Sequence, residues 1–299
     1  MRTAIIDLGT NTFHLLISAG LTAIHEERRP VRLGMGGINH GIILQEAQDR
    51  AVHCLRDYAE TARKMGVETR LAFGTSALRN AANQREVCER IRTETGIEVK
   101  VITGDEEAGL IWEGIRAAMD IGKDPGLIVD IGGGSVEFIL ATSERIFWKR
   151  SLEIGGQRLI ERFHRHDPIL EEEIISIEHY LKDALAEVME VLHIHRPQTL
   201  IGSSGSFDTL SEIHCNRIGI PYPTSPETPL PMDAYSSIHQ DLIKLDRKGR
   251  MDMPGMIELR VDMIVVASVL ITYLLRIHPF RQMRVSSFSL KEGVRATLG

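Results

Sequence analysis

Two glycine-rich turns, each preceded by an aspartate, constrain the fold of this chain more than any other feature. In residues 127–140, an apolar run leads to Asp130, three consecutive glycines follow, and Glu137 precedes a second apolar run. This pattern predicts a strand, a tight turn and a second strand. Without Cβ atoms, glycine N–H groups can approach an anion closely. Because Asp130 and Glu137 would repel that anion unless a cation lay between them, the segment also predicts a Mg²⁺ site.

The same pattern occurs near the N-terminus. Residues 4–17 contain an apolar run, Asp7, a glycine, a small polar turn and a second apolar run. His14 follows Asp7 at the same spacing as Glu137 follows Asp130. A repeat separated by about half the chain predicts two similar domains that face each other across a cleft.

Length and charge bound the number of domains and the class of partner. The chain has 299 residues, 43% of them hydrophobic, which is long enough for two domains with separate cores. A polar link at 120–126, which contains two glycines and a proline, predicts the boundary between them. We therefore expect domains at residues 1–121 and 122–299, with the final helix able to pack back onto the first domain. The net charge of −6 argues against binding to duplex nucleic acid.

Cysteine usage and hydropathy indicate a cytoplasmic protein that does not enter membranes. The chain has three cysteines, far apart and without C-x-x-C spacing, which argues against disulfides and a zinc site. The sequence enters its first strand directly, so we expect no signal peptide. The longest apolar run, residues 263–275, is too short to span a bilayer and predicts a core helix instead.

A strand-to-helix junction at residues 74–83 predicts an anion site. Thr75 or Ser76 is a suitable N-cap for a helix that residues 88–95 continue. The free N–H groups at such a helix start can bind an anion. Arg79 lies one turn into this helix and can reach back over the same position, or it can be a solvated helix residue.

A second junction carries three acidic residues. Asp105, Glu106 and Glu107 occupy the first turn of a helix that follows a short strand. Acidic residues at this place commonly stabilise the helix dipole, and this explanation suffices for the first two. Glu107 lies near the expected domain boundary, where a cleft would be, so it can instead be a functional carboxylate.

A third junction follows the strand at 199–201. Its glycine and serine residues have the chemistry of a phosphate or nucleotide contact, and also that of a plain turn. The residues concerned are Gly202, Ser203, Ser204 and Gly205.

Four later segments complete the expected structure. An amphipathic pattern predicts one long helix over 171–192, and an apolar pattern predicts a core helix over 260–277. Residues 219–231 contain five prolines, which predicts an exposed irregular excursion. The basic run at 247–250 is typical of a solvated turn, with a patch that guides polyanions as the alternative.

Taken together, these motifs resemble the exopolyphosphatase and guanosine pentaphosphate phosphohydrolase (Ppx/GppA) family, within the actin-like, sugar-kinase and heat-shock ATPase superfamily. The resemblance covers essentially the whole chain. It implies an α/β fold class with two ribonuclease-H-like (actin-like) domains facing across a cleft, in the short form that lacks a C-terminal helical domain. The segments that carry it are 7–12, 75–83, 104–108, 130–137, 202–205 and 260–262.

The resemblance also implies an activity, the Mg²⁺-dependent removal of terminal phosphates, and a role for each candidate residue. Glu107 would be the general base that deprotonates the attacking water, and Arg79 would clamp the phosphoryl group. Asp130 and Glu137 would hold Mg²⁺, with Asp7 as a further metal candidate. The residues implied to bind phosphate are Gly9, Thr10, Asn11, Thr12, Thr75, Ser76, Gly132, Gly133, Gly134, Ser135, Gly202, Ser203, Ser204 and Gly205.

Inorganic polyphosphate is the expected substrate, and guanosine pentaphosphate (pppGpp) is the alternative. More distant alternatives on this fold are an ATP-dependent small-molecule kinase and a non-catalytic sensor of a phosphorylated ligand. A homodimer is expected only by family analogy. The chain departs from the family pattern at Thr12, which stands in place of serine, at Gly109, which stands in place of arginine, and at residues 287–289, which replace a glycine pair. The last two departures leave the shape of the substrate channel open.

Overall fold

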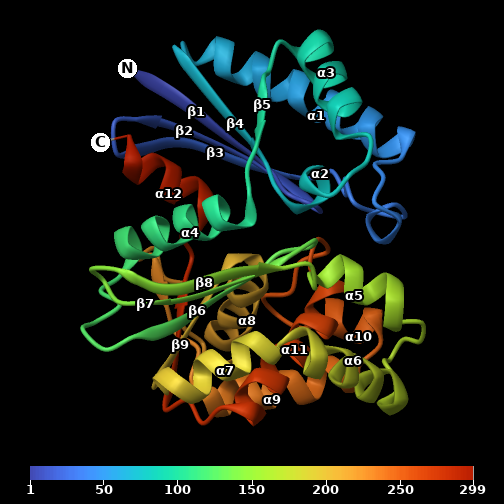
Figure 1. Ribbon diagram of the computed structural model, residues 1–299, viewed down its shortest axis with the longest axis vertical. Helices are drawn as coiled ribbons and strands as arrows, with labels where there is room; N and C mark the ends of the chain where they lie inside the picture. Colours follow the sequence, from blue (N-terminus) through green and yellow to red (C-terminus); the bar gives the residue numbers. More distant parts are fainter. Residues whose placement is uncertain (299) are drawn as a thin grey trace.

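The computed structural model describes residues 1–298, and its first sheet is built from the N-terminal third of the chain (Figure 1). The strand order is β3-β2-β1-β4-β5. β1 pairs antiparallel with β2, and β2 pairs antiparallel with β3, whereas β4 joins β1 in parallel and β5 joins β4 in parallel. The strands are β1 (Arg2–Leu8), β2 (Thr12–Ala19), β3 (Thr22–Pro30), β4 (Thr69–Gly74) and β5 (Val99–Val101).

The second sheet repeats this topology. Its order is β10-β11-β9-β6-β7-β8, so a meander of three strands is again followed by two strands that join in parallel, with β10 added at the edge. This repeat confirms the predicted fold class of two ribonuclease-H-like domains. The strands are β6 (Gly126–Ile131), β7 (Val136–Ala141), β8 (Ile146–Leu152), β9 (Thr199–Ser203), β10 (Glu227–Thr228) and β11 (Gln282–Ser286).

Strand register shows how closely the two halves correspond. Asp7 lies opposite His14 across β1 and β2, and Asp130 lies opposite Glu137 across β6 and β7. The equal spacing of these pairs in the sequence therefore has a structural cause, because each turn closes a hairpin of the same length.

Helices cover both sheets, and one pair separates them. Helices α1 and α3 pack on the outer face of the first sheet, α5 to α11 gather on the far side of the second, and α4 and α12 lie between the two (Figure 1). The helices are α1 (Gln45–Lys64), α2 (Ser76–Arg79), α3 (Gln84–Thr95), α4 (Gly104–Ala118), α5 (Gly156–Phe163), α6 (Glu171–Ala184), α7 (Ala186–His195), α8 (Ser204–Arg217), α9 (Met232–Lys244), α10 (Arg247–Met251), α11 (Met263–Ile277), α12 (Leu290–Thr297) and the 3₁₀ turn η1 (Ile38–His40).

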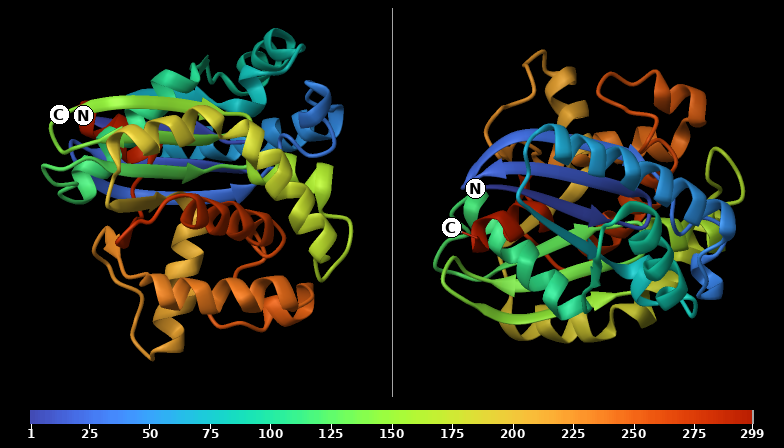
Figure 2. Two further views of the ribbon diagram at one scale, coloured as in Figure 1. Left: turned by 60° about the horizontal axis from the view of Figure 1, so that its bottom comes forward. Right: turned by 90° about the horizontal axis from the view of Figure 1, so that it is seen from above.

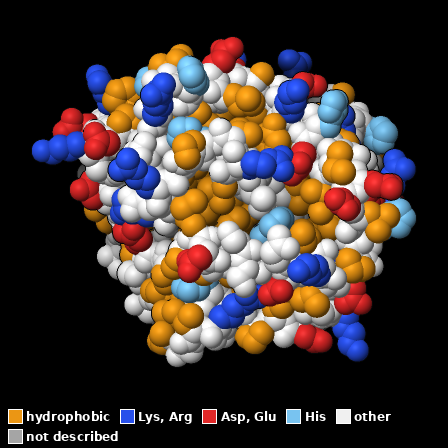
Figure 3. Space-filling model, turned by 90° about the horizontal axis from the view of Figure 1, so that it is seen from below, with side chains coloured by type: hydrophobic (Ala, Val, Ile, Leu, Met, Phe, Trp, Pro, Cys, Tyr) orange, Lys and Arg blue, Asp and Glu red, His pale blue; other side chains and the backbone are white. Residues whose placement is uncertain are grey.

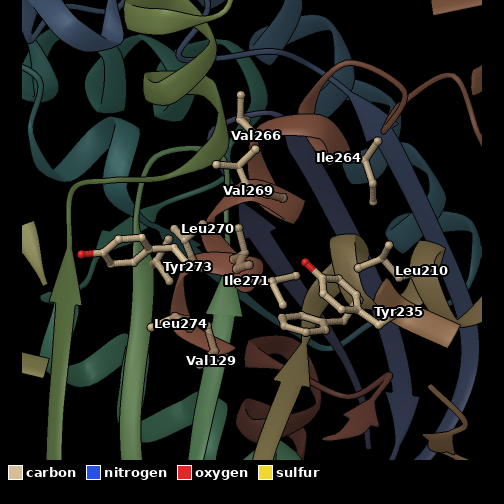
Figure 4. Close-up of a cluster of buried hydrophobic side chains, with 14 of the residues drawn as sticks. Val129, Leu210, Tyr235, Ile264, Val266, Val269, Leu270, Ile271, Tyr273 and Leu274 are labelled. Atoms are coloured by element: carbon tan, nitrogen blue, oxygen red, sulfur yellow. The ribbon is translucent and has the colours of Figure 1, made fainter. Parts of the chain in front are cut away.

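Helix α11 is the centre of the second core, as its apolar sequence predicts. Its side chains are buried on nearly all sides among strands and helices of that half, and Val129 of β6 and Leu210 of α8 belong to the same cluster (Figure 4). The hydroxyl of Tyr235 is satisfied in this core by the Ser268 carbonyl at 2.7 Å. Within residues 1–298, no helix combines the length and apolar character that a membrane crossing requires.

The layer between the sheets joins the two halves. Ile5 of the first sheet and Ile128 of the second pack against apolar side chains of α4 and α12, including Ile111 and Leu290. Helix α12 thus contacts α4 and β1 although it is the last helix of the chain. We propose residues 1–121 and 122–299 as the two domains, with α12 attached to the first (Figure 2).

Two predicted helices are each divided. The expected helix over 171–192 breaks at Leu185, where φ is −99° and ψ is 12°, into α6 and α7. Leu185 is fully buried, so the bend lets both helices pack against the same core. The helix expected to run from Ser76 through 88–95 consists instead of the single turn α2 and a separate α3, joined by a turn at 80–83.

Two surface predictions hold only in part. The proline-rich segment 219–231 is largely irregular and exposed as predicted, but it contains the short edge strand β10, and Leu230 is buried. Pro226 and Pro229 flank this strand, where their missing N–H groups cost no ladder hydrogen bond. The basic run 247–250 forms the short helix α10 and not a turn. Its last residue, Arg250, is not solvated, since it is 1% exposed and pairs with Asp167 at 2.7 Å.

Charged side chains on the face seen from below lie interspersed rather than gathered by sign (Figure 3). Blue and red groups alternate there with hydrophobic ones. Arg247 and Arg250 of the basic run are paired with Asp262 at 3.2 Å and with Asp167 at 2.7 Å, which does not favour this run as a guide for polyanions. The three cysteines are free thiols, and two of them, Cys54 and Cys215, are buried.

We expect Gly114→Ala in α4 to lower the free energy of unfolding by about 1–3 kcal/mol, because overpacking costs this much. A Cβ at Gly114 would lie closer than 3.0 Å to the Ser289 carbonyl of the segment before α12, and backbone cannot easily give way. Gly109→Ala is the matched control in the same helix, since its Cβ would meet only Lys149 Nζ at 3.5 Å. Alanine's helix propensity should leave that control neutral or more stable by up to about 1 kcal/mol. Urea denaturation measures both, and equal effects would contradict the close packing of α4 against α12.

Candidate active site

A cavity of about 130 Å³ lies where the two glycine turns meet between the sheets. Its walls come from both halves of the chain, as the twin turns predict. This volume is well below that of a pocket for a drug-sized ligand, roughly 300–1,000 Å³. The predicted residues that line it are Asp7, Gly9, Thr10, Asn11, Thr12, Thr75, Ser76, Glu107, Asp130, Gly132, Gly133, Gly134, Ser135, Glu137, Ser204 and Gly205.

The two turns pack directly against each other. A Cβ placed on Gly134 would lie closer than 3.0 Å to the hydroxyls of Thr10 and Ser76, and one on Gly133 would lie 2.9 Å from Asn11 Cγ. Real Cβ atoms essentially never approach so closely, so any larger residue would force the two turns apart. The glycines therefore serve the contact between the halves as well as the exposure of backbone N–H groups.

Four carboxylates surround this contact, and burial perturbs all of them. Burial raises the pKa of Asp7 to about 8, with the Glu107 carboxylate adding to the shift. Burial raises the pKa of Glu107 to about 7 although Arg79 opposes the change. Burial also raises the pKa values of Asp130 and Glu137. Burial therefore disfavours the charged form of each carboxylate, and a cation bound among them would offset this penalty.

Serine hydroxyls orient two of these carboxylates. Asp130 Oδ2 accepts hydrogen bonds from the hydroxyls of Ser203 and of Ser289, the latter at 2.6 Å. Glu137 Oε1 accepts from the hydroxyls of Ser135 and Ser151, both at 2.7 Å. Each carboxylate is therefore held in one orientation with its second oxygen left for another partner.

The donor set fits a hard divalent cation. Mg²⁺ prefers oxygen ligands and is commonly held by one or two carboxylates together with substrate phosphates and water. Asp7 Oδ1 is buried and has no hydrogen-bond partner among residues 1–298, and the raised pKa values show that added positive charge would be favourable. In the part of the chain that the structure describes, no three acidic, histidine or cysteine side chains converge into a complete metal cage. The protein would therefore supply only part of the coordination shell.

Arg79 lies behind the cavity wall rather than in its lining. Its Nη1 donates to Glu107 Oε2 at 2.7 Å and to the Ile102 carbonyl at 3.3 Å. Its Nη2 donates to Glu153 Oε1 at 3.2 Å. In this arrangement the guanidinium is hydrogen-bonded to Glu107 and lies outside the cavity lining, so its predicted contact with a phosphoryl group stays a prediction.

Two of the predicted phosphate-binding residues also lie outside the lining. Gly202 and Ser203 are the last residues of β9, and Ser203 is completely buried. Its hydroxyl binds Asp130 and so supports the site from behind. Only Ser204 and Gly205 of this junction reach the cavity.

Basic side chains at the cavity had no predicted role. Arg260 is 8% exposed, lines the cavity, lies against Gly205, and its Nε has no hydrogen-bond partner among residues 1–298. Burial lowers the pKa of Arg260 to about 10, which still leaves it charged at neutral pH. Arg28 and Lys291 line the same cavity, as does His14, whose pKa burial lowers well below its ordinary value. Two features of the sequence could have indicated that these side chains lie at the site: Arg260 belongs to a family motif, and His14 follows Asp7 at the spacing at which Glu137 follows Asp130.

Paired anion-binding turns, buried carboxylates and an arginine at one cavity define an enzyme that handles phosphoryl groups on the actin-like fold. A sequence model of the Ppx/GppA phosphatase family matches residues 15–298. The chain belongs to this family and is a hydrolase of phosphoanhydrides.

Solved structures agree along the whole chain. The exopolyphosphatase from Cytophaga hutchinsonii ATCC 33406 is similar with a TM-score of 0.96 and 39% identity, over 100% of this chain and 98% of that one. The PPX-GPPA enzyme from Aquifex aeolicus gives a TM-score of 0.78 at 25% identity, over 99% of both chains. An exopolyphosphatase-like protein shares the fold with a TM-score of 0.86 at 24% identity, over 98% and 97%.

Asp7→Asn is expected to stabilise the metal-free protein increasingly as the pH rises. The pKa of Asp7 in the folded protein, about 8, lies above its ordinary value of 3.8. Between these values the folded protein retains a proton that the unfolded chain releases, so the contribution of this group to the free energy of unfolding falls with rising pH. In EDTA, the difference in Tm between variant and wild type should be small near pH 4 and grow up to about pH 8. Asp124→Asn, at an exposed position, is the control, and a difference independent of pH would contradict the raised pKa.

Proposed function

We propose that this protein is an exopolyphosphatase that hydrolyses the terminal phosphoanhydride of inorganic polyphosphate in the presence of Mg²⁺ and releases orthophosphate. The observation that carries the proposal is the position of Glu107. Its carboxylate is 7% exposed and lines the cavity where both glycine turns meet. A base at this place can reach a water molecule beside a phosphate held by the turns.

Glu107 has the properties that a general base needs. A base is most effective when its pKa lies near the working pH, and burial brings the pKa of Glu107 to about 7. The hydrogen bond from Arg79 fixes the direction of the carboxylate. We assign to Glu107 the removal of a proton from the attacking water, and to Arg79 the orientation of Glu107.

The glycine turns have the properties of a phosphate cradle. Residues 9–12 and 132–135 line both sides of one small space, where backbone N–H groups other than that of Gly132, which donates to the Ser135 carbonyl, would be available to an anion. Such groups bind phosphate oxygens and stabilise charge that develops on them during phosphoryl transfer. We assign the terminal phosphate of the substrate to this space.

The residues that would hold Mg²⁺ are Asp130 and Glu137, with Asp7 beside them. When bound, the cation would neutralise charge on the phosphate oxygens, as metals do in phosphoryl transfer. Ser203 and Ser289 would keep Asp130 directed toward it, and Ser135 and Ser151 would do the same for Glu137.

The basic side chains support a substrate whose negative charge continues beyond the terminal phosphate. Arg260, Arg28 and Lys291 would attract the next phosphates of a chain. A volume of about 130 Å³ suits the terminal phosphate of either substrate, with the rest of the molecule outside the cavity. The similarity to the Cytophaga hutchinsonii exopolyphosphatase favours polyphosphate as the substrate. The alternative substrate is pppGpp, whose several phosphates the same basic groups would also attract.

A parallel assay of phosphate release tests the substrate. We expect long polyphosphate to be hydrolysed with the highest kcat/KM, pppGpp to be weaker and ATP to be weakest, each only with Mg²⁺ present. The physical reason is that a longer polyanion engages more of the basic side chains at the cavity. Faster hydrolysis of pppGpp would favour the alternative, and release from none of the substrates would refute a hydrolytic function on them.

Glu107→Gln is expected to lower kcat by roughly 10²–10⁴-fold, the usual contribution of a positioned general base. The amide cannot accept the proton of water but fills the same space. Glu106→Gln is the matched control, because Glu106 is exposed and glutamine preserves the capping box with Thr103. Phosphate release from polyphosphate with Mg²⁺ measures both variants, and near wild-type turnover in Glu107→Gln would exclude its assignment as the base.

A further inference from the structure

Glu153, which follows β8, and Arg158, in the first turn of α5, have been given no role in the site, where Glu153 appears only as a partner of Arg79. Neither lines the cavity, yet both connect to residues that do. Their contacts cross from the second half of the chain to the first. Since partners in different domains keep these contacts only while the domains stay together, the two residues are candidates for a role that depends on the closed arrangement.

Glu153 binds two side chains of the first domain. Its Oε1 accepts a hydrogen bond from Arg79 Nη2 at 3.2 Å, and its Oε2 accepts one from the Ser76 hydroxyl at 2.5 Å. Ser76 is 1% exposed and packs against the Gly134 backbone. A single carboxylate thus fixes both the arginine that orients Glu107 and a serine at the contact of the glycine turns.

Arg158 holds Glu153 in place, and each of its three guanidinium nitrogens donates a hydrogen bond to a different partner. Its Nη2 donates to Glu153 Oε2 at 2.9 Å, its Nε to the Gly134 carbonyl at 2.8 Å, and its Nη1 to the Ile38 carbonyl at 2.9 Å. The first two partners lie in the second domain and Ile38 lies in the first. The side chain is only 11% exposed, so these hydrogen bonds are shielded from water.

We propose that Glu153 is a positioning residue for the hydrolysis and that it acts through Arg79 on Glu107, with Arg158 holding it in place. This inference rests on the proposed role of Glu107 as the base. The charges alternate along a continuous path from Glu107 to Arg79, Glu153 and Arg158, which ends on the carbonyl of a phosphate-binding glycine. The carboxylate of Glu107 and the glycine turn at 132–135 are therefore fixed relative to each other by side chains and not only by the sheets.

The physical argument is one of geometry. Arg79 donates through Nη1 to Glu107 and to the Ile102 carbonyl, and through Nη2 to Glu153 and to the Ser151 hydroxyl, so Glu153 is the charged partner that holds the second nitrogen. Without Glu153, only the Ser151 hydroxyl holds Nη2, which weakens the orientation of the guanidinium, and the Ser76 hydroxyl loses its acceptor. Misplacement of a catalytic group by about 1 Å can reduce a rate by roughly 10²-fold. Burial is the main cause of the raised pKa of Glu107; Arg79 opposes the shift, and the carboxylates of Asp130 and then Glu153 add to it.

Glu161 provides the control that separates positioning from simple adhesion between domains. It also crosses the interface, since its Oε1 accepts from the Gly36 N–H at 2.8 Å and its Oε2 accepts from Asn39 Nδ2 at 3.2 Å. None of its hydrogen bonds involves Arg79 or Glu107. If Glu153 served only to hold the domains together, the two glutamates would be equivalent.

The test is a comparison of Glu153→Gln with Glu161→Gln in phosphate release from polyphosphate with Mg²⁺. We expect Glu153→Gln to lower kcat about 10- to 100-fold while KM changes less than about twofold, because the substrate contacts remain and the base is misplaced. Glu161→Gln should keep the wild-type kcat. Equal losses in both variants, or a wild-type kcat in Glu153→Gln, would overturn the proposal.

Two further measurements keep the result independent of folding and of substrate choice. In a double-mutant cycle with Arg79→Lys, the two losses in kcat should be far from additive, because they remove one unit; additive losses would count against it. In NMR spectra of the protein without substrate, the two terminal nitrogens of Arg79 should give distinct signals in wild type and averaged signals in Glu153→Gln. Unchanged Arg79 signals would overturn the positioning role even if the wild type releases no phosphate, which by itself contradicts only the proposed function.

Discussion

The contact between the two glycine turns is the constraint on which the rest of the site depends. Gly133 and Gly134 have no side chains, so Thr10, Asn11 and Ser76 can lie against their backbone. This approach lets N–H groups from both domains border one space of phosphate size. A side chain at either glycine would separate the sheets, admit water and leave the carboxylates around the space solvated.

Exclusion of water then determines the electrostatics. The same closeness that forms the cradle buries Asp7, Glu107, Asp130 and Glu137, and burial is the largest cause of each raised pKa. Such a cluster is unfavourable on its own and favourable with a cation, so the proposed affinity for Mg²⁺ and the strain of the metal-free site would have a common origin. Arg79 is hydrogen-bonded to one of these four carboxylates, Glu107, and this arrangement would leave the other three available to a cation.

Features that repeat along the chain could be predicted from the sequence, whereas single residues with distant partners could not. The twin turns, the fold class and the cavity position of Glu107 were predictable because an Asp–Gly pattern recurs and strand periodicity is local. Residues such as Glu153 and Arg158 were not, because each is a single polar residue whose partners lie up to 120 positions away. The break at Leu185 has the same reason, since the core and not the local sequence bends that helix. The sequence predicts that Arg79 contacts the phosphoryl group. Its hydrogen bonds to Glu107 and Glu153, which place it behind the cavity lining, depend on the three-dimensional structure.

The packing of α4 against α12 has a mechanical consequence. The chain passes between the domains next to this pair, and a Cβ on Gly114 or Gly293 would overlap the Ser289 or the Leu110 carbonyl, respectively. We therefore expect this close contact to resist shear and any relative rotation of the domains to pivot about this pair, which lies toward one side of the molecule (Figure 1). The separation between the two domains would then increase most at the opposite end, where Glu161 of α5 contacts Gly36. In the proposed hydrolysis, that end is the side from which a substrate would reach the cavity.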